Sequence, residues 1–165
     1  MIDLVTSKLA MMVAAVIILT TVLGVYAVHR EHGRDLELMN IAETICGAVD
    51  DMNAIQGDTI LNITFDRERE GRFIEPYIGG KGYDITITDH EVIVSQDDRH
   101  FELDFMAPVH LWKPERNSYT SLEVEEIGAE HGVLSFTSGT DFSVERARVM
   151  VGDVGRFMTF VYFRE

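Results

Sequence analysis

The amino-acid sequence predicts an α+β protein. A long N-terminal helix, first transmembrane and then amphipathic, is followed by an antiparallel β-sheet domain that is sandwich-like or a compact barrel. Three observations support this: an early run without charge, an apolar stripe with helical spacing, and short segments of alternating apolar and polar residues between turn residues. We expect a transmembrane helix in residues 1–30, an amphipathic helix in residues 31–56 and a β-rich domain in residues 57–165.

The uncharged run covers residues 9–28 and has the length of a membrane-spanning helix. At 1.5 Å per residue it reaches about 30 Å, the thickness of a hydrocarbon core. A cleaved signal peptide has a shorter apolar region and a small-residue cleavage site. A buried core helix has a polar stripe, whereas here only Thr20, Thr21 and Tyr26 interrupt the apolar surface. The pattern favours a retained single-pass anchor.

A second helical pattern runs from about residue 35 to 55. Its apolar residues recur at intervals of three and four: Leu38, Ile41, Ile45, Ala48, Met52 and Ile55. This stripe has two candidate partners, the protein's own β-sheet and the same helix in neighbouring subunits. The two alternatives do not exclude one another. Gly57 and Asp58 mark the end of the helix.

The rest of the chain has the alternation of short β-strands. We expect a first strand at residues 61–65 and a three-stranded meander over residues 83–105. Later strands are expected at residues 121–127, 132–137, 141–151 and 157–163. Residues 110–112, between Pro108 and Pro114, form an edge strand or a loop.

Composition excludes several classes of function. The 165 residues include 28 acidic and 14 basic ones, for a net charge of −14, which repels nucleic acid phosphates. We therefore expect no nucleic acid partner. Cys46 is the single cysteine, so no internal disulfide can form. We interpret it as a small apolar residue on a helix flank, with an intermolecular disulfide or a lipid attachment as alternatives.

No enzyme motif is present, and we expect no catalytic residues, no metal and no cofactor. Residues 79–82 (GGKG) lack the Ser/Thr and the helix of a phosphate loop, and are interpreted as a turn. His29 and His32 would need further ligands to hold a metal, and the acidic pairs lack the spacing of a calcium loop. A pocket joining His100 or His110 to several carboxylates would instead indicate an enzyme.

A few residues are candidates for surface roles. Asn62 begins an Asn-Ile-Thr sequon, which is a glycosylation site only if the domain lies outside the cell. Trp112 and Tyr119, on proline-flanked loops, are candidate partner contacts. The charged loop at residues 66–72 is interpreted as a solvated surface, with a subunit contact as the alternative.

The order of elements resembles that of type IV pilins, in which an apolar helix passes into an amphipathic one and then a β domain. Residues 77–87 (YIGGKGYDITI) followed by residues 92–94 (VIV) are also similar to archaeal pilin-like membrane proteins. The resemblance implies that residues 9–28 hold the subunit in the membrane and later pack against other subunits in a filament. It implies that residues 38–55 lie against the β domain.

The chain departs from the pilin pattern in two ways. Residues 1–8 have one lysine, no glycine and only Ser7 as a small candidate for processing, and the apolar run lacks the acidic residue common near its start. We therefore expect either a minor pilin-like component or an anchor that is never processed. An archaellum stator-like protein, with one span and an outside β-sandwich that binds the envelope layer, has a similar plan.

These observations predict a non-enzymatic, single-pass structural protein of the cell membrane that assembles through its N-terminal helix. Its partners are the membrane and either itself or other pilin-like or envelope proteins. The alternative is a single-span binding module. Lys8 before the span, against Arg30 and Arg34 after it, slightly favours a cytoplasmic C-terminal side. The resemblance and the sequon favour an extracytoplasmic β domain, which we expect.

Overall fold

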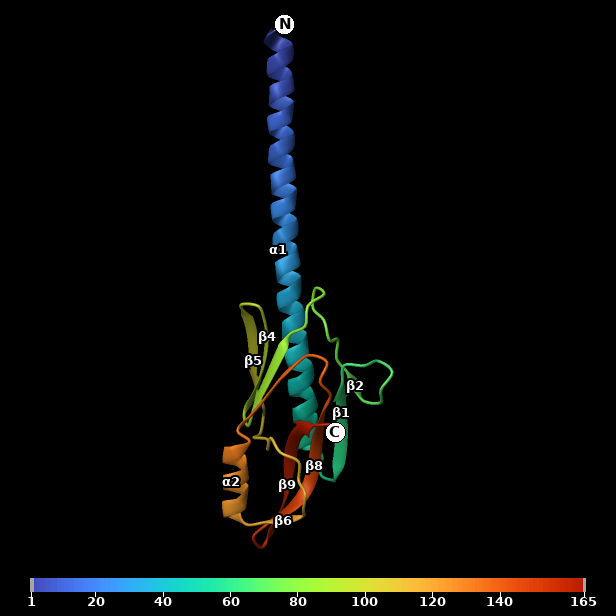
Figure 1. Ribbon diagram of the computed structural model, residues 1–165, viewed down its shortest axis with the longest axis vertical. Helices are drawn as coiled ribbons and strands as arrows, with labels where there is room; N and C mark the ends of the chain where they lie inside the picture. The colour runs from blue at the N-terminus through green and yellow to red at the C-terminus, as the bar shows by residue number, and fades with distance from the viewer. Residues whose placement is uncertain (1, 165) are drawn as a thin grey trace. The chain divides into compact units, whose positions relative to one another are not determined.

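The computed structural model describes residues 2–164, with side chains for residues 11–164 (Figure 1). Contacts divide the chain into two compact units, Met1–Leu36 and Glu37–Glu165.

The N-terminal helix, α1, runs without interruption from Ile2 to Ala54. It passes through the predicted boundary at residue 30, so the two predicted helices are one element. Three glycines lie within it, and each costs only about 1 kcal/mol relative to alanine. The three prolines of the chain, which would break a helix, all lie after residue 75.

Two β-sheets follow, which confirms the α+β class and is consistent with a sandwich-like arrangement. The five-stranded sheet contains β1 (Thr59–Thr64), β2 (Arg72–Phe73), β6 (Ser118–Tyr119), β8 (Phe142–Val151) and β9 (Val154–Phe163). The four-stranded sheet contains β3 (Asp84–Thr88), β4 (Glu91–Gln96), β5 (Arg99–Asp104) and β7 (Val133–Thr137).

The two sheets differ in their pairing. The four-stranded sheet has the order β5-β4-β3-β7 and is entirely antiparallel, so the predicted meander is confirmed. In the five-stranded sheet β8 pairs antiparallel with β1 and β9, whereas β2 and β6 are short strands that pair in parallel with β1 and β8. The β8–β9 hairpin has the longest strand pairing in this sheet.

One hydrophobic core joins α1 to both sheets. Figure 1 shows the C-terminal turns of α1 flanked by β4–β5 on one side and β1 on the other. The buried residues of α1 are Leu38, Ile41, Ala42, Ile45, Ala48, Val49 and Met52. They share a cluster with Ile85 and Val94 of one sheet and with Ile63 and Val144 of the other. The stripe therefore packs against the protein's own β domain.

A second, smaller core lies on the opposite face of the β8–β9 hairpin. It contains Trp112, Tyr119, Val149 and Phe160. Strands expose successive side chains to opposite faces, so β9 contributes Val161 to the first core and Phe160 to the second. Sequence alternation alone did not reveal that this hairpin is covered on both sides.

One expected strand is wrong. Residues 121–127 belong to a helix, α2 (Ser121–Glu130), whose Val124 and Ile127 cover the second core. Thr120 and Glu123 form a capping box in which each side chain bonds the other's backbone N–H, at 3.2 and 2.7 Å. This Thr-x-x-Glu signature was present in the sequence, but the alternation of Leu122 and Val124 suggested a strand.

Candidate functional site

The N-terminal part of α1 is the largest apolar surface of the described chain. Side chains of residues 11–32 are all exposed, including the large apolar ones. These residues span about 33 Å at 1.5 Å per residue. Within the described residues, one helix is long and apolar enough to cross a membrane, and it is this one.

The two threonine hydroxyls inside this segment are satisfied by the helix itself. The Thr20 hydroxyl donates to the carbonyl oxygens of Val16 and Ile17, both at 2.9 Å, and the Thr21 hydroxyl donates to Ile17 O at 2.8 Å. A hydroxyl that bonds its own helix presents little unsatisfied polarity to lipid. His29 and His32 lie exposed at the C-terminal end of the segment.

Most of the predicted assembly stripe on residues 38–55 is buried in the core of the β domain. Leu38, Ile45 and Ala48 are fully buried, and Ile41 and Met52 are 6% and 3% exposed. Ile55 departs from the stripe, because α1 ends at Ala54 and Ile55 is 41% exposed. Of the two partners expected for this stripe, the protein's own sheets cover it from Leu38 to Met52, and only Ile55 remains exposed. Contact of this stripe with a neighbouring subunit stays a prediction.

Cys46 lies on the flank of the same helix segment and is half-buried. Its thiol lies 3.6 Å from Asp50 Oδ2 and 3.4 Å from the carbonyl oxygen of Asp104. Burial, and then the charge of Asp50, raise the pKa of Cys46 to about 11. Because the thiolate is the reactive form, this environment disfavours disulfide formation and alkylation.

The two aromatic residues predicted as partner contacts are core residues. Trp112 is 6% exposed and Tyr119 is 4% exposed. The Trp112 ring centroid lies 5.0 Å from that of Tyr119 and 4.8 Å from that of Phe160. The Tyr119 hydroxyl accepts the backbone N–H groups of Glu115 and Arg116 at 3.1 and 3.2 Å. The predicted contact therefore has no exposed ring to use, because both side chains hold the 112–119 loop.

Asn62 lies within β1, between β2 and β8, and is half-buried. Its Oδ1 accepts the Ser143 hydroxyl at 3.0 Å. Glycosylation of Asn62 stays a prediction. The GGKG segment forms a turn, because Gly79 and Gly80 have positive φ and Ile78 pairs with Lys81. The buried Gln96 amide holds this turn by donating to the carbonyl oxygens of Ile78, Lys81 and Gly82 at 3.0–3.2 Å.

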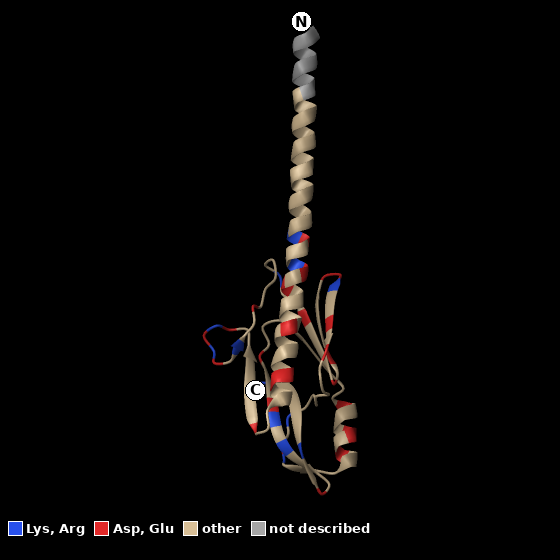
Figure 2. Cartoon of the chain, turned by 180° about the vertical axis from the view of Figure 1, so that it is seen from behind, with Lys and Arg blue, Asp and Glu red and all other residues tan. Residues whose placement is uncertain are grey.

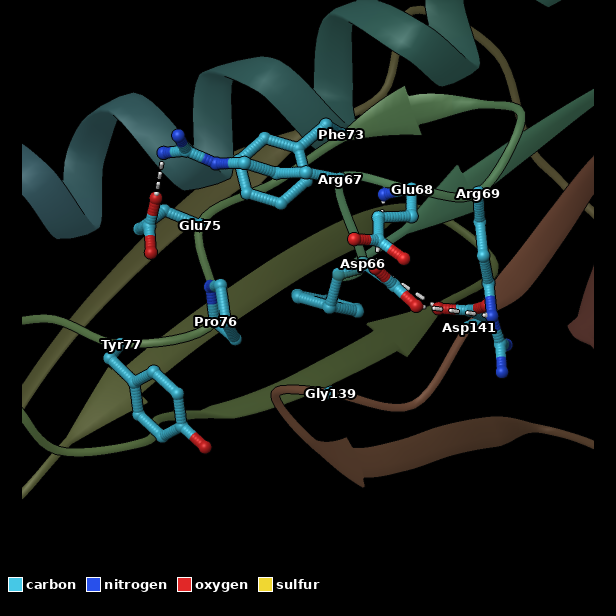
Figure 3. A pocket seen from close by; sticks show the side chains of 11 residues that line it. Asp66, Arg67, Glu68, Arg69, Phe73, Glu75, Pro76, Tyr77, Gly139 and Asp141 are labelled. Carbon is cyan, nitrogen blue, oxygen red and sulfur yellow. Dashed lines mark hydrogen bonds and ion pairs between the residues drawn. The ribbon is translucent and has the colours of Figure 1, made fainter.

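The charged loop between β1 and β2 borders an open cavity of about 630 Å³ (Figure 3). Arg67 pairs with Glu75 at 2.9 Å and lies 4.9 Å above the Phe73 ring. Tyr77 forms another wall of the cavity and is 61% exposed. Because Arg67 already has a carboxylate partner, it is not a free cation for an anionic ligand.

Arg69 and Asp141 tie this loop to the start of β8. Arg69 Nη1 lies 2.7 Å from Asp141 Oδ2, and Asp141 Oδ1 accepts the Phe65 N–H at 3.2 Å. Burial raises the pKa of Asp141, but the hydrogen bonds from Arg69 and Phe65 lower it by more, so the pKa lies below its usual value. The charges of this loop thus pair with one another and hold its shape.

The histidines of the β domain do not form a metal site or a pocket with several carboxylates within the described residues. His90 and His100 are exposed, and His110 is half-buried beside β9. Among the described residues, no group of three or more His, Cys, Asp or Glu side chains could hold a metal ion. The cavity beside His110 is lined by no carboxylate.

Sequence reasoning missed one polar cluster, where the end of α1 meets the β8–β9 hairpin. Arg146 Nη1 donates to Thr159 Oγ1 at 2.9 Å and to Asn53 Oδ1 at 3.4 Å, and Thr159 Oγ1 donates to Asn53 Oδ1 at 2.5 Å. A signal was present: on the core face of β8, Phe142 and Val144 are followed by Arg146 where a third apolar residue would continue the pattern.

The described part of the chain therefore offers an exposed apolar helix segment, a self-paired charged loop and the Arg146 cluster. The first is an exposed apolar surface long enough to cross a membrane, the second is structural, and the third lines a cavity. Comparisons with protein-family models, with curated proteins and with solved structures find no match.

Proposed function

We propose that the protein is a membrane-anchored structural subunit, pilin-like in plan, which assembles through the N-terminal part of α1 and carries its β domain outside the membrane. One observation supports this most. A single helix leaves residues 11–32 exposed on every side, while residues 38–52 of the same helix form the core of the β domain.

The physical argument starts from the exposed segment. A helix that is apolar on all sides is stable only where lipid or other apolar helices cover it. Because residues 38–52 are already covered by the two sheets, the available apolar surface for both membrane and helix–helix contact is residues 11–32. A pilin-like subunit uses this one surface twice, first in the membrane and then among neighbouring helices.

A single-span binding module is the alternative, and one observation favours it. Beyond the exposed segment, the sheets cover the stripe from Leu38 to Met52, and Leu36 and Met39 are the large apolar side chains of α1 that remain exposed there. A permanent anchor needs only that segment, with the β domain free to contact an envelope layer or another protein. Under both proposals the domain is non-enzymatic and the protein is a single-pass protein of the cell membrane.

Cysteine cross-linking in native membranes separates the two. Cys46→Ala removes the one native thiol, and Val16→Cys or Ile18→Cys then places a single thiol on the exposed helix, where the native side chains are 60% and 64% exposed. Asp98→Cys, in the exposed turn after β4, is the matched control on the β domain. Oxidation followed by non-reducing electrophoresis reports contact between copies.

A pilin-like subunit should be cross-linked at one or both helix positions, and combining the two cysteines should extend dimers into a ladder of higher oligomers. The Asp98→Cys variant should remain largely monomeric. Monomers at every position would instead support a solitary anchored module. Release of the protein by carbonate at high pH, without detergent, would contradict membrane anchoring altogether.

A further inference from the structure

An open cavity of about 400 Å³ lies where the end of α1, the 107–110 loop, α2 and the β8–β9 hairpin come together. Its volume falls within the range of small-molecule sites, about 300–1,000 Å³. The lining side chains that could carry positive charge are Arg146, Arg156 and His110, and no carboxylate lines it. This is unusual in a chain that has twice as many acidic as basic residues.

The Arg146 guanidinium is held in place without a counter-ion. Both of its side-chain hydrogen bonds come from Nη1, to Thr159 and Asn53, while its Nε is buried without a partner. The described residues place no carboxylate in an ion pair with it. Burial lowers the pKa of Arg146, yet a guanidinium is too basic to lose its proton in a protein, so the charge remains. A half-buried positive charge without a partner is costly unless something supplies the negative charge.

The other walls complete a site for an anion with an apolar body. Arg156 is exposed on β9, and no carboxylate of the described residues pairs with it. Burial lowers the pKa of His110, although the charge of Asp89 opposes this, so the site favours the neutral imidazole, which can donate or accept a hydrogen bond. Apolar lining comes from Val124, Val151, Phe157, Met158 and Pro108. Figure 2 shows basic positions on the β8–β9 strands and acidic ones along α2.

We propose that this cavity binds a small organic anion, with its carboxylate on Arg146 and Arg156 and a short apolar body against the walls formed by β9 and α2. The Asn53–Thr159–Arg146 hydrogen bonds orient the guanidinium before the ligand arrives. Such preorganisation reduces the cost of binding. The proposal is independent of how the protein is anchored or assembled.

The test uses the full-length chain in non-ionic detergent micelles at constant ionic strength. Butanoate is the probe, butanamide is its uncharged analogue, and inorganic phosphate is an anion without an apolar body. Amide chemical shifts of residues 157–159 and of His110 are followed by NMR. Butanoate should shift them saturably and butanamide should not. Equal shifts with butanamide would overturn the anion site, and phosphate binding as tight as butanoate would overturn the role of the apolar walls.

Three variants assign the binding to the cavity. Arg146→Met keeps an unbranched side chain as far as the position of Nε and removes the charged guanidinium beyond it. It should weaken butanoate binding about tenfold or more, the usual loss for a charged hydrogen bond. Arg156→Gln, at an exposed position that folding tolerates, should weaken it about two- to fivefold. Arg148→Gln is the matched control, because Arg148 is exposed on β8, the strand of Arg146, and does not line the cavity.

The pattern among the variants decides the outcome. Binding that survives in Arg146→Met and Arg156→Gln would overturn the proposal. So would a loss in Arg148→Gln equal to that in Arg156→Gln, because it would show a general effect of net charge. Unchanged Trp112 fluorescence in each variant checks that the neighbouring core is intact, since Trp112 packs against Phe160 on the same hairpin.

Discussion

Replacing Ile45 with alanine tests whether the stripe on α1 belongs to the core or to a subunit interface. Ile45 is fully buried in the cluster that joins α1 to both sheets. The change removes three carbons, worth about 2.4 kcal/mol at about 0.8 kcal/mol each, and leaves a cavity that adds to the loss. We expect the free energy of unfolding to fall by about 3–4 kcal/mol, a large part of the usual 5–15 kcal/mol.

Urea unfolding of the full-length chain in micelles, followed by the fluorescence of the single tryptophan, measures this loss. Met39→Ala is the control on the same helix, because Met39 is 41% exposed and should cost much less. The reasoning would be refuted if Ile45→Ala changed the free energy of unfolding by less than 1 kcal/mol while reducing cross-linking between copies. That result would place the stripe at a subunit interface.

Three further predictions concern caps, acid stability and the thiol. Thr120→Ala should remove the cap of α2, at a cost of about 1 kcal/mol, and hydrogen exchange should show α2 amides exchanging about fivefold faster. Hydrogen bonds from the Thr120 N–H, the Arg116 side chain and the Thr120 hydroxyl lower the pKa of Glu123 from 4.5 to about 2, and the pKa of Asp141 is also lowered. Both carboxylates contribute stability that is present above their unfolded pKa values and is lost as pH falls through the folded ones. Urea midpoints should therefore drop between about pH 4.5 and 2, and Asp141→Asn should show a smaller drop than the parent protein. Because the pKa of Cys46 is raised to about 11, its alkylation by iodoacetamide should be slow at pH 8 and should speed up on unfolding; fast labelling of the folded protein would contradict this environment.

The local sequence pattern was sufficient to predict those elements in which apolar residues recur at a single helical or strand spacing. The uncharged run, the stripe from Leu38 to Met52 and the meander over residues 83–105 are examples. The error at residues 121–127 arose where two local signals competed. Leu122 and Val124 alternate as in a strand, but the capping box at Thr120 favours a helix, and packing of Val124 and Ile127 on the second core stabilises that helix.

The candidate surfaces were harder to predict because burial depends on distant residues. Trp112 lies in a loop between prolines and Tyr119 ends the short strand β6, yet both are buried in one cluster with Phe160, which is far along the chain. Arg146 was overlooked because an arginine in a strand usually faces solvent. Its partners Asn53 and Thr159 lie 93 and 13 residues away in sequence, and only the fold brings the three side chains together.

The sequence by itself determined the apolar helix, its continuation as an amphipathic stripe, the acidic surface and most strands, because hydrophobic length and period act within neighbouring residues. Only the tertiary structure decided that the protein's own sheets cover the stripe, that each face of the β8–β9 hairpin contributes to a core, and that Arg146 lines a cavity without a carboxylate. The physical reason is that an apolar side chain requires some apolar partner, and a charged side chain requires some polar or oppositely charged partner. Contacts between residues far apart in the chain decide which of the suitable surfaces becomes that partner.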